Sequence, residues 1–247
     1  MNIKTEQIQL GTLRVDVIHK DIKNVHLNVL PPNGKVRISA PYRMDLDTIR
    51  IFAISKLAWI KKQQAKFLQQ EREAPREYVS RESHYYKGQR YLLRVIYHQG
   101  PPKVILRNKE YIDLYVQKGS NVEKRKKVMT EWYRKQLKER IPFLIEKWQK
   151  IIGVEVKDWG VRQMKTRWGS CTVKAKRIWL NLELAKKPEY CLEYVIVHEM
   201  LHLLERKHND RFVAYLDHFM PQWRSYKAEL NQYIGTNNFL ERKKLNN

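Results

Sequence analysis

The chain has 247 residues, of which 43% are hydrophobic, and its 49 lysines and arginines against 26 aspartates and glutamates give a net charge of +23. This hydrophobic content excludes global disorder, and the basic excess favours polyanionic partners such as nucleic acid, although a basic enzyme would have the same composition. Two cysteines, Cys171 and Cys191, provide no disulfide framework and indicate a reducing compartment. The sequence shows neither a signal peptide nor an apolar stretch of membrane-spanning length, so we expect a cytoplasmic protein without a membrane partner.

The N-terminal part alternates between apolar and polar residues over residues 8–38, with a Pro- and Gly-containing turn at residues 31–34. This period predicts antiparallel strands in a small sheet that ends at Pro41. Apolar residues then recur at helical spacing over residues 45–73, which predicts a helix, broken at most once, with Asp45 or Asp47 as its N-cap.

Short apolar runs between residues 85 and 116 predict a meander of strands separated by Gly- and Pro-containing turns. Tyrosines alternate with basic residues there, and they could stack nucleic acid bases or lie half-buried in the sheet. These tyrosines are Tyr85, Tyr86, Tyr91, Tyr97, Tyr111 and Tyr115. Residues 121–152 then show helical spacing, with Pro142 as an expected kink or joint.

Two further strands are predicted at residues 154–160 and at residues 177–184, the run RIWLNLEL. Because the second strand directly precedes the next helix, we expect its unpaired edge to accept an extended peptide as one more strand. Downstream, Asn209 or Asp210 is expected to cap one helix, and Pro221 to begin another.

The segment 190–211 contains His198, Glu199 and His202 in the pattern H-E-x-x-H. Residues four apart on a helix lie one above the other, so both imidazoles can reach one zinc ion, with Glu199 beside them as general base for a water molecule. A catalytic zinc site takes a third protein ligand, for which His208 is the candidate and a carboxylate such as Asp217 the rival. In the signature H-E-x-x-H-x-x-G-x-x-H a glycine makes the turn toward the third histidine, but Glu205 occupies that position here, so the turn must be made differently.

The sequence resembles the bacterial YgjP-like metallopeptidases, a zincin group related to the SprT-like and WLM-type metalloproteases. The matching segments are RWGSC at residues 167–171, IWLNLEL at 178–184, Pro188, residues 194–208, Phe212, Pro221 and Leu230. The resemblance implies zinc bound by His198, His202 and His208, with Glu199 as base.

The resemblance also implies that Arg167, Trp168 and Ser170 line the site. Arg167 could bind a substrate carboxylate or stabilise an oxyanion, whereas the alternative is a packed turn held by Trp168. Cys171 is interpreted as a buried thiol, with a fourth zinc ligand in an inactive form as the alternative.

Together these patterns predict an α+β protein with a strand-rich N-terminal region (residues 1–120), a helical zincin-like domain with a short edge-stranded sheet (121–235) and a polar tail (236–247). The predicted function is a zinc-dependent peptidase acting on proteins or peptides. The alternative is a DNA-associated module or a DNA-tethered protease, in which nucleic acid binding by the basic surface is the main role.

Overall fold

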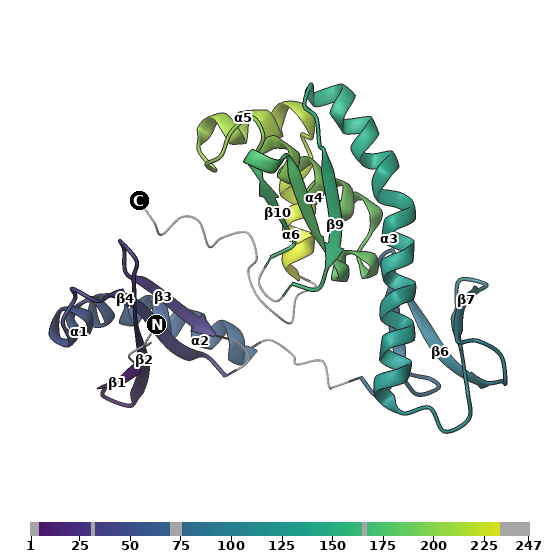
Figure 1. Ribbon diagram of the computed structural model, residues 1–247, viewed down its shortest axis with the longest axis horizontal. Coiled ribbons are helices and arrows are strands. Elements are labelled where there is room, and N and C mark those ends of the chain that lie inside the picture. Colours follow the sequence, from purple (N-terminus) through teal and green to yellow (C-terminus); the bar gives the residue numbers. More distant parts are fainter. Residues whose placement is uncertain (1–4, 31–32, 70–75, 165–166, 233–247) are drawn as a thin grey trace. The chain divides into compact units, whose positions relative to one another are not determined.

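The computed structural model describes residues 5–30, 33–69, 76–164 and 167–232 (Figure 1). It divides into two compact units, a first unit up to residue 72 and a second unit from residue 73. Both strands and helices contribute to the described residues, which confirms the predicted α+β class. The predicted polar tail at residues 236–247 lies outside them.

The first unit contains a four-stranded sheet followed by two helices. The strands are β1 (Thr5–Leu10), β2 (Leu13–Lys20), β3 (His26–Leu30) and β4 (Lys35–Pro41), in the spatial order β1-β2-β4-β3. The two hairpins are antiparallel, but the central strands β2 and β4 run parallel, so the prediction of a purely antiparallel sheet is wrong. An alternating pattern determines which face of a strand is buried and does not determine the direction of its neighbour.

The core of the first unit lies between this sheet and the helices α1 (Leu46–Ser55) and α2 (Leu57–Gln69). Val17 and Ile38 from the sheet and Ile49 and Ile60 from the helices are fully buried in one hydrophobic cluster. The Asp45 carboxylate accepts a hydrogen bond of 2.7 Å from the backbone N–H of Thr48 and so caps α1. The predicted helix with a single break is confirmed, because α1 and α2 are separated only at residue 56.

The second unit begins with another four-stranded sheet, made of β5 (Ser83–Tyr86), β6 (Gln89–Tyr97), β7 (Lys103–Arg107) and β8 (Tyr111–Val116). Its order is β5-β6-β8-β7, with β6 and β8 parallel, so the predicted meander is wrong. The helix α3 (Val122–Ile152) follows and packs Tyr133, Leu137 and Ile141 into a hydrophobic core shared with this sheet.

The N- and C-terminal ends of α3 are set by their capping residues. The Asn121 side chain accepts a hydrogen bond from the Lys124 N–H at one end, and Gly153 adopts the left-handed conformation at the other. The predicted joint at Pro142 is not observed, since the helix continues through this residue to Ile152.

A three-stranded sheet then leads to the last helices. It consists of β9 (Asp158–Arg162), β10 (Gly169–Thr172) and β11 (Arg177–Asn181), in the order β10-β11-β9, with the short 3-10 helices η1 (Val173–Ala175) and η2 (Leu182–Lys186). The predicted strand at residues 177–184 therefore ends at Asn181, and it is central in the sheet. The edge strands are β10 and β9, so the prediction that the 177–184 strand offers its edge to a peptide is wrong.

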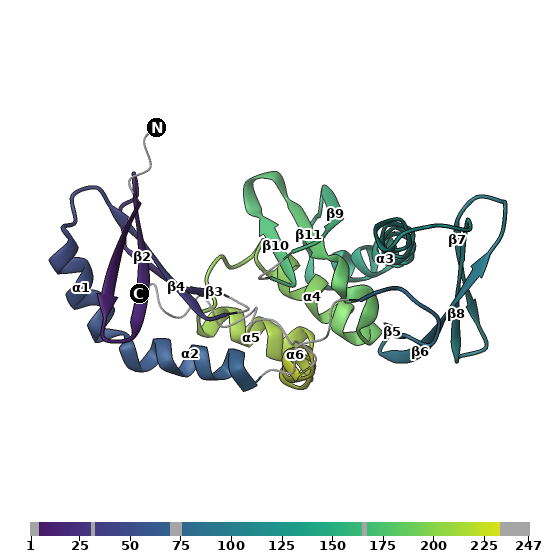
Figure 2. The same cartoon turned by 90° about the horizontal axis from the view of Figure 1, so that it is seen from below.

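Helix α4 (Glu189–Leu201) lies against this sheet and is followed by α5 (Asp210–Phe219) and α6 (Trp223–Gln232) (Figure 2). Buried residues extend around the whole circumference of α4, as expected for a helix at the centre of a domain. Side chains from β5–β8 and from α3–α6 belong to one hydrophobic cluster, which spans the predicted boundary at residue 120. The division into an N-terminal region (residues 1–120) and a zincin-like domain (121–235) stays a prediction. No helix among the described residues is long and apolar enough to cross a membrane.

Candidate metal centre

The last turn of α4 brings two imidazoles together. His198 and His202 are both buried, with 6% of each residue exposed, and their ring centroids lie 5.1 Å apart. With His208 they form a group in which the candidate ligand atoms lie within 4.8 Å of one another. The three histidines predicted from the sequence as metal ligands are thus adjacent in the structure.

The turn after α4 carries His208 back to the other two histidines. The backbone N–H groups of Leu204 and Glu205 both donate to the carbonyl of Leu201, which closes the turn without a glycine. Glu205 is not among the residues with positive φ. Its carboxylate accepts the backbone N–H of Lys207, and this hydrogen bond lowers the pKa of the Glu205 carboxyl. The expectation that this turn is made without the glycine of the related signature is confirmed.

The rival ligand Asp217 takes part in different interactions. Its carboxylate accepts hydrogen bonds from the Trp223 indole at 2.8 Å and from the Arg224 guanidinium. The hydrogen bond from Arg224, the largest cause, lowers the Asp217 pKa. His208, and not Asp217, is the third member of the group that the structure assembles.

The ring nitrogens have a distribution that suits a cation. Nδ1 of His202 lies 3.1 Å from the carbonyl oxygen of Glu205, to which it can only donate, so Nε2 of this ring is left as the ligand atom. Nε2 of His198 and Nε2 of His208 are 2.9 Å apart. Three neutral imidazoles converging in this way match the donor set of a catalytic zinc site.

Phe212 forms an apolar wall beside the three imidazoles. Its ring centroid lies 5.0, 4.8 and 4.7 Å from those of His198, His202 and His208. The residue is held there because Asn209 caps α5 by accepting a hydrogen bond from the Phe212 N–H. The Tyr194 ring also contacts His198, and burial raises the pKa of the Tyr194 hydroxyl. These contacts restrict the imidazole ring orientations.

Glu199 is 5% exposed and lies directly against strand β10. A Cβ atom placed on Gly169 would come within 2.7 Å of Glu199 Cγ and 2.8 Å of its Oε1. Such distances are far inside van der Waals contact, so glycine at position 169 allows the strand to approach the carboxylate this closely. Within the RWGSC segment, Gly169 thus leaves room for the Glu199 carboxylate because it has no side chain.

The other residues of the RWGSC segment have different surroundings. Arg167 is exposed, Trp168 is 2% exposed beneath the strand, and Ser170 is half-buried. Cys171 is half-buried against the hydrophobic core, so its interpretation as a buried thiol is wrong, and it is not part of the histidine group. Participation of Arg167, Trp168 and Ser170 in substrate binding stays a prediction.

Asn181 is a buried residue whose role the sequence reasoning missed. Its side-chain amide donates to the carbonyls of Met164 and Arg167 at 3.1 and 2.7 Å, and its backbone N–H donates to the carbonyl of Trp168. It therefore fixes the described ends of the β9–β10 connection beside the metal centre. A polar residue in the apolar run IWLNLEL was the available signal.

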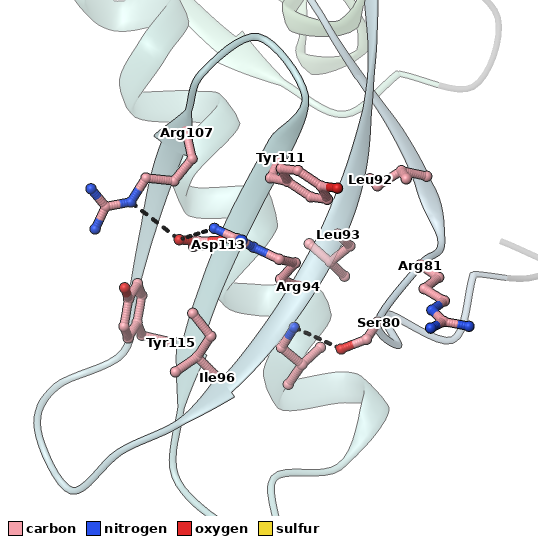
Figure 3. A pocket seen from close by; sticks show the side chains of 11 residues that line it. Ser80, Arg81, Leu92, Leu93, Arg94, Ile96, Arg107, Tyr111, Asp113 and Tyr115 are labelled. Carbon is pink, nitrogen blue, oxygen red and sulfur yellow. Dashed lines mark hydrogen bonds and ion pairs between the residues drawn. The ribbon is translucent and has the colours of Figure 1, made fainter.

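The six tyrosines singled out in the sequence do not share one surface. Tyr86 and Tyr91 belong to the core, whereas Tyr111 and Tyr115 lie on the face of the β5–β8 sheet opposite the buried Leu93. There they line a depression of about 870 Å³ (Figure 3). Arg94 and Arg107, from the same face, both form ion pairs with the buried Asp113.

The histidine group provides the donor set expected of a metallopeptidase domain, within an α+β fold. The family model described as "YgjP-like, metallopeptidase domain" matches residues 23–233, and the chain belongs to this family. Among solved structures, a similar one is the crystal structure of the metallopeptidase zymogen of Pyrococcus abyssi abylysin, with 19% identity over 39% of this chain and 97% of that chain and a TM-score of 0.37. A search of curated proteins found no match.

Proposed function

We propose that this protein is a zinc-dependent peptidase that hydrolyses peptide bonds, with Glu199 as the general base. The observation that carries the proposal is the position of the Glu199 carboxylate, which follows His198 on α4 and contacts the edge strand β10 at Gly169. A base, a cation site and a strand edge suited to an extended peptide are thereby combined in one place.

His198, His202 and His208 would hold the zinc ion. When bound, zinc supplies Lewis-acid activation of the scissile carbonyl and of the attacking water. The Glu205 carbonyl keeps His202 in the tautomer that presents Nε2, and Phe212 limits rotation of all three rings. Metal binding therefore requires little reorganisation of these side chains.

Glu199 performs the proton transfers in this proposal. Its carboxylate accepts a proton from the attacking water and passes the same proton to the nitrogen of the leaving amine as the C–N bond breaks. The carboxylate is positioned by its helix and by the backbone of Gly169, both of which are parts of the buried core.

The substrate would bind as an additional strand along β10. Among the described residues β10 pairs on one side only, with β11, so its other edge can exchange backbone hydrogen bonds with a peptide. A peptide residue on the Gly169 side then faces Glu199. This arrangement favours an extended chain over a folded surface as the substrate.

The test combines metal analysis with peptide cleavage. Glu199→Gln is expected to retain stoichiometric zinc and to lose at least about 10³-fold in kcat/KM, because the amide cannot accept the proton. His208→Ala is expected to lose both zinc and activity. Glu193→Gln, on the same helix, and His218→Ala, on α5, are controls whose side chains lie outside the histidine group.

A Glu199→Gln variant that cleaves as fast as the parent would exclude Glu199 as the base. Retention of zinc at full occupancy in His208→Ala would exclude His208 as a ligand.

Nucleic acid binding is a second candidate function, favoured by the open face of the β5–β8 sheet. Tyr111 stacks with Arg94, whose guanidinium carbon lies 4.4 Å from the ring centroid, and Lys103 lies 5.1 Å from the ring of Tyr115. Basic and aromatic side chains on an open sheet can bind phosphates and stack bases of a single strand. The net charge of +23 acts in the same direction.

Fluorescence anisotropy with a labelled single-stranded oligonucleotide tests this second function across a salt series. We expect Tyr115→Ala and Arg107→Gln to weaken binding, and Arg107→Gln to reduce the salt slope by about 1. Arg50→Gln, on α1, is the control for charge alone. Absence of binding at low salt would exclude the function.

A further inference from the structure

One face of the small β10-β11-β9 sheet points away from the candidate metal centre. Gly169 on β10 pairs with Leu180 on β11, and both belong to the face that meets α4. The neighbouring cross-strand row therefore lies on the opposite face, because side chains alternate along a strand. This row consists of Ser170 on β10, Trp179 on β11 and Gly160 on β9.

Trp179 lies flat across this outer face. A Cβ atom on Gly160 would be 2.3 Å from the Trp179 ring, so the indole covers the backbone of β9 where no side chain stands. Arg162, also on β9, stacks on the indole, with its guanidinium carbon 4.9 Å from the ring centroid. The indole thereby directs the long Arg162 side chain across the sheet.

The Arg162 side chain reaches the edge strand. Its Nη2 donates to the Ser170 hydroxyl at 3.4 Å, although Arg162 originates two strands away from β10. A peptide strand added to β10 would lie about 4.8 Å further out, with cross-strand Cβ atoms about 5 Å apart. A side chain of that peptide on the Ser170 face is therefore within reach of the guanidinium.

The charge of Arg162 is not matched by an acidic group among the residues that the structure describes. The other arginine on this face, Arg177, forms an ion pair with Asp158 at the opposite end of β11. No carboxylate of the described chain lies within ion-pair distance of Arg162, which is exposed. A positive charge is thus held in place at the strand edge with its remaining donors open to solvent.

We propose that Arg162 is a specificity-determining residue that selects peptides with Asp or Glu on the side chain facing Ser170. This inference rests on the proposed peptidase function and on peptide addition to β10. The peptide carboxylate accepts hydrogen bonds from the Arg162 guanidinium and from the Ser170 hydroxyl, on the face opposite Glu199. The side chains next to it point toward the metal centre and are selected by other groups.

Cleavage of a synthetic peptide library with randomised positions tests the proposal, with the cleavage sites read by mass spectrometry. We expect the parent to enrich Asp and Glu about fivefold at one position of the cleaved peptides. Arg162→Glu is expected to replace this preference with one for Lys and Arg at the same position, and Arg162→Lys to retain it. Arg177→Glu, which makes the same charge change on the same face, is expected to leave the preference unchanged.

A reversed preference cannot come from a packing defect, since a loss of stacking on Trp179 would lower cleavage of all peptides alike. An unchanged preference in Arg162→Glu, with cleavage intact, would overturn the inference and leave the peptidase function standing.

Peptide binding to the zinc-loaded Glu199→Gln protein separates the two proposals. If the parent cleaves nothing, but an acidic peptide binds about fivefold more tightly than its Lys analogue only while Arg162 is present, the subsite stands and the peptidase function fails. Equal binding of both peptides would overturn the subsite.

Discussion

The two four-stranded sheets of this protein have the same topology and differ in what their cores include. Each consists of two antiparallel hairpins joined by a parallel central pair and followed by a helix, in the orders β1-β2-β4-β3 and β5-β6-β8-β7. Each following helix is capped by an Asx side chain, Asp45 in one case and Asn121 in the other. The chain therefore uses one arrangement of strands twice.

The registers of the first hairpins and of the central parallel pairs match in the two sheets, whereas the second hairpins close on loops of different length. The first hairpins both close on a two-residue turn, between Leu10 and Leu13 and between Tyr86 and Gln89. Counting from these turns, Ile38 corresponds to Ile112, and both are fully buried on the helix-facing side.

The difference lies in what covers the sheets. The first unit completes its core with its own α1 and α2, whereas the second sheet shares α3 and one hydrophobic cluster with the helices of the metal centre. The same fold thus acts as a self-contained unit in one place and as part of the catalytic scaffold in the other. Damage to the two sheets should have different consequences.

The largest effect is expected from the matched substitutions Ile38→Ala and Ile112→Ala. Each removes a fully buried side chain and should lower the stability of its own unit by about 2–5 kcal/mol. Ile112→Ala should lower the unfolding temperature of the second unit. Added zinc should raise the unfolding temperature of this unit only, because the three histidines belong to it. Calorimetry with and without zinc measures both transitions, and a single transition lowered equally by both variants would contradict the separation.

A smaller contrast is expected at the turns of the first hairpins. Gly11 and Gly88 both have positive φ, +60° and +80°, but a Cβ on Gly88 would lie 2.6 Å from Pro188 Cγ at the start of α4, whereas nothing lies within 4 Å at Gly11. Gly11→Ala should lower the free energy of unfolding by about 1 kcal/mol, because alanine is strained at positive φ. Gly88→Ala should lower it by about 3 kcal/mol, because the clash with Pro188 is added to this strain. Chemical denaturation measures both; equal costs would show that the contact with Pro188 is unimportant.

A third contrast concerns pH, and it should be confined to the second sheet. Ile8 in the first sheet corresponds to His84 in the second, where burial and then Arg76 lower the His84 pKa from 6.5 to about 4. Between these values the unfolded chain binds the proton more readily, so stability decreases as the pH falls, by at most about 1.4 kcal/mol per pH unit. Below about pH 4 both states are protonated and the loss is complete.

His84→Leu should remove this part of the pH dependence. Denaturant midpoints of the zinc-free parent and variant are compared at pH 7.5 and pH 5, and the difference between the two proteins isolates the contribution of His84. An identical slope in both proteins would assign the pH dependence to other groups.

Local signals in the sequence predicted much of the fold, while the partners of the strands were not predictable from them. The caps Asp45 and Asn209 were each one of two predicted alternatives, because an Asp or Asn directly before a run of helical apolar spacing indicates a helix N-terminus. The parallel pairing of β2 with β4 depends on hairpin docking, about which alternation says nothing. The run RIWLNLEL continued the apolar pattern past Asn181, where the chain turns into a 3-10 helix because Asn181 bonds to the preceding loop.

The candidate site was predictable where one helix turn contains it. His198, Glu199 and His202 follow from their spacing, and the proximity of His208 was a correct extension. The strand β10, with the sequence GSCT, was not predicted because it has no apolar alternation, although Gly169 was expected to let the backbone approach closely, as it does at Glu199. Arg162 gave no signal, since its position depends on the register of three strands.

The 31 residues of α3 span about 46 Å, and the helix contacts both the β5–β8 sheet and the short sheet of the metal centre. A continuous helix with partners along its length cannot lose one partner without exposing apolar residues of its own. Amide hydrogens in the middle of α3 should therefore exchange only through global opening of the second unit. The β5–β8 sheet and the metal centre would then form a single cooperative folding unit, in which neither part opens locally without the other.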